Sequence, residues 1–125
     1  MESLDNCQGN LITNEREFQT KKRHKIVKHG FLKKRSKILH LWKTRFFILN
    51  EKYLFAFTGV EKDADCTMTM LLENCDEIRT CDAEIKKDNS FCIRASNVNY
   101  YFMAKSEEDR RDWIEKISKY CGVKN

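Results

Sequence analysis

Hydrophobic and polar positions alternate in short runs between about residues 26 and 104, and polar turns separate these runs. Alternation with a period of two is typical of strands that bury one face. The runs predict seven strands, at 26–34, 41–50, 53–57, 67–72, 78–81, 90–95 and 99–104. Strands this short and this closely spaced indicate an antiparallel sandwich or barrel.

The last part of the chain changes period and predicts a helix. Ser106 is a good N-cap with an acidic residue three positions later, which is a variant of the capping box. Trp113, Ile117 and Tyr120 then recur at helical spacing and form one apolar stripe. We expect Gly122 to end the helix, because glycine is favoured just after a helix.

The residues before the first strand lack a sustained apolar pattern. We therefore expect a flexible tail over 1–22 and one domain over 23–122. The chain has no run near the roughly 18 apolar residues of a membrane-spanning helix, and its polar start does not resemble a signal peptide. These features predict a cytoplasmic protein whose membrane contacts come from its folded surface.

Charge is strongly segregated along the chain. The net charge is +5, but residues 21–45 carry eleven Lys or Arg and no Asp or Glu, which leaves −6 for the remainder. We interpret the run KKRHK at 21–25 as part of this basic face. Such segregation orients a protein at an anionic surface.

The six cysteines contain no C-x-x-C spacing. Without a secretory signal, a disulfide framework is not expected. We predict reduced thiols, several of them acting as small buried hydrophobic residues.

The stretch from residue 30 to residue 49 carries the candidate chemistry. In its second strand Lys43 and Arg45 share a face with apolar residues further along, and in its first strand Lys34 shares a face with Leu32. If both faces look inward, the apolar members enter a core and the three cations lie at its rim. Three converging cations repel one another unless an anion lies among them, so this pattern predicts an anion site.

The same stretch resembles the first hairpin of pleckstrin homology (PH) domains of the phosphoinositide-binding type. It reads Gly-aromatic-Leu-x-Lys, a variable loop, then Trp-Lys-x-Arg-aromatic-Phe-Ile-Leu. LLENC at 71–75 and SEEDRRDWIEKI at 106–117 resemble the end of the fourth strand and the C-terminal helix of that family. The resemblance covers residues 28–120. It implies a mainly β fold, a seven-stranded antiparallel barrel or sandwich capped by one C-terminal helix, with Trp113 plugging its open side.

The resemblance also implies a site. Many members that bind phosphoinositides carry a lysine late in strand one and a Lys/Arg-x-Arg pair early in strand two, positions that match Lys34, Lys43 and Arg45 here. We expect Arg45 to be the anchor, because a guanidinium makes bidentate bonds to phosphate. Arg35 and Lys37 in the following loop are expected to meet lipid head groups.

Two alternatives remain for Ile38 and Leu39 in the same loop. They could dip into the membrane interface, or they could extend the strands and pack inward. Members selective for 3-phosphorylated inositides often carry a tyrosine and a further cation on strands three and four, where this chain has Ala56 and Asp65-Cys66. The inositide preference is therefore open.

The sequence gives little support for catalysis. It contains neither G-x-x-x-x-G-K-[ST] nor G-x-S-x-G, and its histidines lie apart from most cysteines. We predict a non-catalytic, monomeric module without cofactor or metal, recruited as a peripheral protein to membranes that carry phosphoinositides. The alternative is a protein-interaction module for a peptide or a small GTPase. Nucleic acid is not an expected partner, because the strands lack an aromatic stacking platform interleaved with the charge.

Overall fold

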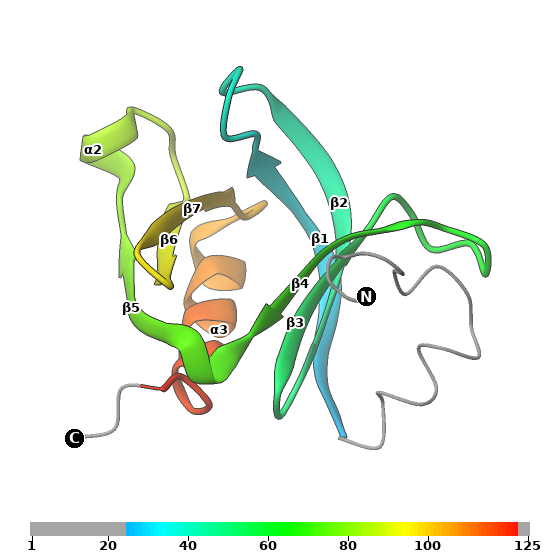
Figure 1. Ribbon diagram of the computed structural model, residues 1–125. Coiled ribbons are helices and arrows are strands. Elements are labelled where there is room, and N and C mark those ends of the chain that lie inside the picture. Colours follow the sequence, from blue (N-terminus) through cyan, green and yellow to red (C-terminus); the bar gives the residue numbers. More distant parts are fainter. Residues whose placement is uncertain (1–24, 123–125) are drawn as a thin grey trace.

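The computed structural model describes residues 25–122. The expected tail and residues 21–24 of the basic run lie outside this range. Within it the chain forms seven strands and a C-terminal helix (Figure 1), which confirms the expected mainly β fold. The elements are β1 (Ile26–Arg35), β2 (Trp42–Asn50), β3 (Tyr53–Phe57), β4 (Cys66–Leu71), β5 (Cys75–Thr80), β6 (Ser90–Ala95), β7 (Val98–Met103) and α3 (Glu107–Ser118).

The strands form one antiparallel sheet in the order β4-β3-β2-β1-β7-β6-β5. β1 pairs with β2 along almost its whole length but with β7 only at Lys33 and Lys34. The sheet bends where these pairings meet, and its two halves enclose α3 (Figure 1). β4 and β5 are the two edge strands of the sheet, and a short 3-10 turn, η1 (Leu72–Asn74), connects them.

Alternate residues of the strands fill the space between sheet and helix. Leu32, Phe47 and Leu49 are buried there, as the alternation predicted. The ring of Phe47 makes edge contacts with Phe102, at 5.6 Å between ring centres, and with Trp113, at 6.4 Å. Burial of each such side chain contributes about 1.5–3 kcal/mol, so this core is the main source of stability.

α3 begins as the sequence predicts. The Ser106 side-chain oxygen accepts a hydrogen bond from the backbone N–H of Asp109 at 3.0 Å. Trp113 and Ile117 are fully buried and face the sheet. No helix in the described range is long and apolar enough to cross a membrane.

The expected role of Gly122 is wrong, because α3 already ends at Ser118. The backbone N–H of Gly122 instead donates to the carbonyl oxygens of Leu72, at 3.0 Å, and Cys75, at 2.9 Å. A Cβ at this position would overlap the carbonyl oxygen of Glu73. Glycine is therefore needed for the close approach of two backbone segments.

One short helix, α2 (Asp82–Ile85), lies between β5 and β6, where the sequence pattern predicts no helix. The Asp82 carboxylate accepts a hydrogen bond from the backbone N–H of Asn89 at 3.0 Å and pairs with Arg110 of α3. Burial acts to raise the pKa of Asp82, but these bonds outweigh it and the pKa is lowered. Contacts between distant residues thus hold α2 in place.

The expectation of reduced thiols is wrong for one pair. Cys75 at the start of β5 and Cys121 after α3 form a disulfide, with 5.2 Å between their Cα atoms. The bond joins residues 46 apart in sequence and fastens the chain beyond α3 to the sheet. Cys66, Cys81 and Cys92 are buried, as predicted for small hydrophobic residues.

Candidate anion-binding site

The register of the first hairpin brings three of the predicted cations to one face. Lys34 of β1 lies directly opposite Lys43 of β2, and Leu32 lies opposite Arg45. Because opposite residues in an antiparallel pair share a face, all three cations lie on the face that carries Leu32 and the core. They stand at the end of the sheet nearest the hairpin turn.

Lys34 is the central member of this group. It is half-buried, and burial lowers the pKa of its ammonium group; the charges of Lys37 and Arg45 lower the pKa further. Lys37 of the turn therefore belongs with the three strand residues. We call the group Lys34, Lys37, Lys43 and Arg45 the cationic mouth. Within residues 25–122 no carboxylate forms an ion pair with any of the four.

An aromatic ring that sequence reasoning missed lies at the mouth. The Nζ atom of Lys34 is 5.7 Å from the centre of the Tyr100 ring, and that of Lys37 is 5.1 Å from the same centre. Lys34 pairs with Phe102 across β1 and β7, so Tyr100, two residues away, lies on the same face. The available signal was strand alternation in β7, but only the β1–β7 register places Tyr100 beside Lys34.

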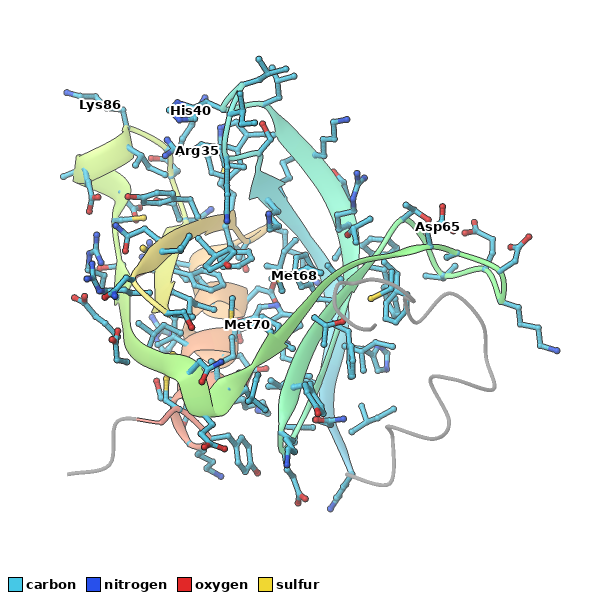
Figure 2. The ribbon with its side chains drawn as sticks, viewed as in Figure 1. Arg35, His40, Asp65, Met68, Met70 and Lys86 are labelled. Carbon is cyan, nitrogen blue, oxygen red and sulfur yellow. A yellow bond between two sulfur atoms is a disulfide. The ribbon has the colours of Figure 1, made fainter. Side chains whose placement is uncertain are left out.

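Arg35 does not join the mouth. It follows Lys34 in β1 and points to the other face of the sheet, where its guanidinium lies 4.2 Å from the centre of the Tyr101 ring. The Tyr101 hydroxyl donates to Glu84 of α2 at 3.1 Å. Figure 2 shows Arg35 at the same end of the hairpin as His40.

The hairpin turn presents the two aliphatic residues to solvent. The backbone N–H of Ser36 donates to the carbonyl oxygen of Leu41 at 2.7 Å, and the Ser36 hydroxyl accepts from the N–H of Leu41 at 3.0 Å. Between them Ile38 is 90% exposed and Leu39 is 70% exposed. The alternative that these residues pack inward is wrong. Membrane contact by Ile38 and Leu39 stays a prediction.

The positions noted on strands three and four supply no cation to the mouth. Ala56 is fully buried opposite Met68 of β4. Asp65 lies in the loop between β3 and β4, and Figure 2 shows it well away from Arg35 and His40. Neither position therefore adds a cation to Lys34, Lys37, Lys43 and Arg45.

The comparisons with known proteins concern the family and the fold of the chain. The PH domain family model matches residues 26–122. Human pleckstrin homology domain-containing family A member 2 is 30% identical over 98 residues, which cover 74% of this chain and 22% of that protein. Human pleckstrin-2 is also 30% identical over 98 residues, covering 74% of this chain and 27% of that protein. The chain thus spans about a quarter or less of the length of these curated relatives.

Two solved structures show the same fold. The C-terminal PH domain of pleckstrin in complex with D-myo-Ins(1,2,3,4,5)P5 is 29% identical, with a TM-score of 0.65, and the match covers 77% of this chain and 98% of that one. The PH domain of Slm1 in complex with phosphoserine is 24% identical, with a TM-score of 0.66 over 78% of this chain and 97% of that one. Family model, relatives and fold agree, and this chain belongs to the PH domain family.

Proposed function

We propose that this PH domain binds the phosphorylated head group of a phosphoinositide at the cationic mouth and is thereby recruited, without catalysing a reaction, to the cytoplasmic surface of membranes. One observation carries the proposal: the register places Lys34 opposite Lys43, with Arg45 on the same face, at the exposed end of the hairpin. The complex of the pleckstrin C-terminal PH domain, 29% identical, with an inositol pentakisphosphate supports this choice of ligand.

The chemistry of the mouth suits a ring with several phosphates. Burial lowers the pKa of Lys34, and the charges of the nearby Lys37 and Arg45 lower it further. A phosphate among the three cations would replace this repulsion with charge-assisted hydrogen bonds. The guanidinium of Arg45 can offer two parallel N–H groups to one phosphate. Arg35, on the other face of β1, would add attraction to anionic lipid of about 1 kcal/mol.

The exposed turn extends the proposal from a head group to a membrane. Ile38 and Leu39 project beyond the mouth on the same hairpin, so a domain that holds a head group would carry both side chains into the interface. Replacing both with serine should weaken binding to vesicles that contain the lipid, while binding of the soluble head group stays unchanged. Equal losses in both assays would contradict a separate membrane contact.

Vesicle co-sedimentation tests the site directly. Vesicles with singly or multiply phosphorylated inositides are compared with phosphatidylserine vesicles of equal charge. Arg45→Ala is tested beside Arg111→Ala, which removes the same charge from an exposed position on α3. Circular dichroism confirms that both variants fold.

We expect selective binding that Arg45→Ala abolishes and Arg111→Ala retains. Equal binding to every anionic vesicle would reduce the site to a general basic surface. Absence of binding to all vesicles would overturn the proposal and favour a protein partner, the alternative raised by the sequence.

A further inference from the structure

We propose that Tyr100 is a positioning residue of the cationic mouth: its ring gathers the ammonium groups of Lys34 and Lys37 into one phosphate subsite on the β7 side. This inference rests on the proposed function. The inference adds an uncharged residue, Tyr100, to the cationic mouth. It also divides the mouth into a β7 side, where Lys34 and Lys37 contact Tyr100, and a β2 side. Lys43 and Arg45 form the β2 side.

The two lysines reach the ring from different parts of the hairpin. Lys34 is in β1, and Lys37 is in the turn that follows it. Their Nζ atoms lie 5.7 and 5.1 Å from the centre of the same ring, within the range of an attractive cation–π contact. Tyr100 is half-buried and packs against the core, so its ring is a fixed surface against which two flexible side chains rest.

Electrostatics alone would separate these lysines. Burial of Lys34 disfavours its charged form, and the like charge of Lys37 disfavours it further. The negative face of an aromatic ring acts in the opposite sense, because it attracts the ammonium groups of both lysines. Tyr100 thus offsets part of the repulsion before any ligand arrives, and a phosphate could then accept hydrogen bonds from both lysines with little reorganisation.

Lys34 lies between the two sides of the mouth. Its charge is influenced by Lys37 on the β7 side and by Arg45 on the β2 side. A ring with several phosphates can use both sides together, whereas a monophosphate can occupy only one. We therefore expect Tyr100 to favour multiply phosphorylated ligands over singly phosphorylated ones.

The neighbouring residue provides a matched control. Tyr101 also lies beside a cation, at 4.2 Å from the Arg35 guanidinium, but on the opposite face of β7. Tyr100→Leu and Tyr101→Leu remove the same ring from adjacent positions, and only the first faces the mouth. Tyr100→Phe retains the ring and removes the hydroxyl.

Calorimetric titration of the full chain with D-myo-Ins(1,2,3,4,5)P5 and with D-myo-inositol 4-phosphate tests the inference. Tyr100→Leu should weaken pentakisphosphate binding by roughly threefold to tenfold. It should affect the monophosphate less, because Lys43 and Arg45 remain. Tyr100→Phe and Tyr101→Leu should bind like the wild type.

A double-mutant cycle separates positioning from packing. Lys37→Ala should cost less affinity in the Tyr100→Leu background than in the wild type, since the ring no longer holds Lys37. If Tyr100→Leu does not fold, Tyr100→Ile, a residue suited to strands, takes its place. Wild-type affinity in the folded variant, an equal loss in Tyr100→Phe, or an additive cycle would overturn the role of Tyr100. Failure of the wild-type chain to bind either ligand would instead overturn the proposed function.

Discussion

Lys28 and Lys34 lie on the same strand, point to the same face and each rest over an aromatic ring, yet their surroundings are opposite. Lys28 Nζ is 4.9 Å from the centre of a Trp113 ring and pairs with Asp112 at 2.8 Å and Asp109 at 3.3 Å. Lys34 lies over Tyr100 among further cations. One lysine has carboxylates from α3 as partners, whereas the other faces like charges.

We propose that this difference separates a structural cation, Lys28, from a ligand-binding one, Lys34. Burial acts to lower the pKa of Lys28, but its bonds to Asp112 and Asp109 outweigh this and the pKa is raised. Burial also lowers the pKa of Lys34, and the charges of Lys37 and Arg45 lower it further. Lys28 ties β1 to α3, while Lys34 would gain from an anion that the fold itself does not supply.

The largest expected effect concerns the ring beneath Lys28. Trp113 is fully buried in the core, so Trp113→Ala should reduce the free energy of unfolding by about 3–5 kcal/mol. Tyr100→Leu, at the half-buried ring beside Lys34, should cost much less. Urea denaturation of both variants measures the difference. Equal losses would contradict the view that only the first ring is structural.

At the mouth we expect a loss of binding without a loss of stability. Lys34→Ala should weaken inositol pentakisphosphate binding by about tenfold to hundredfold, because a buried charge-assisted contact is removed. Its free energy of unfolding should change by less than about 0.5 kcal/mol, since no ion pair is lost. Calorimetry and urea denaturation on one preparation give both numbers. A strongly destabilised variant with intact binding would reverse the assignment.

Lys28→Ala should show the converse pattern. Removal of this ammonium leaves Asp109, which is largely buried, without one of its partners. We expect a loss of about 1–2 kcal/mol in stability and no change in inositol pentakisphosphate affinity. The same two measurements apply, and weaker binding in a folded Lys28→Ala variant would show that the two lysines are not independent.

The smallest effect is a difference in pH dependence. Lys28 has a folded pKa above 10.5, so the stability it contributes is present below pH 10.5 and is lost as pH rises through the folded value. Lys34 has a folded pKa below 10.5, so its protonated form destabilises the fold and that penalty disappears as pH rises through the folded value towards 10.5. Urea denaturation of wild type and each alanine variant across this range isolates each lysine. Changes of the same sign would contradict the comparison.

The strands and the cations of the mouth could be predicted from the sequence because both depend on local alternation. The bounds of β3 and β6 agree with the prediction at both ends, and Lys34, Lys43 and Arg45 share a face as expected. These features follow from residues close in sequence, because side chains alternate along each strand and a short turn sets the register of a hairpin.

Features that depend on distant contacts could not be predicted. Tyr100 reaches the mouth only through the pairing of β1 with β7, and α2 is held by the pairing of Asp82 with Arg110 of α3. The disulfide joins Cys75 and Cys121 across 46 residues of sequence. Proximity in the chain alone groups Arg35 with Lys37, although β1 directs the Arg35 side chain to the other face of the sheet.

The most direct test follows the two lysines by NMR while D-myo-Ins(1,2,3,4,5)P5 is added to the full chain. The side-chain signals of Lys28 and Lys34 are assigned with the two alanine variants, and each pKa is measured with and without ligand. If the mouth binds the head group, the Lys34 signal shifts and its pKa rises on binding, while the pKa of Lys28 stays unchanged. A saturated protein in which the Lys34 pKa does not move would contradict the assignment of the mouth as the anion site.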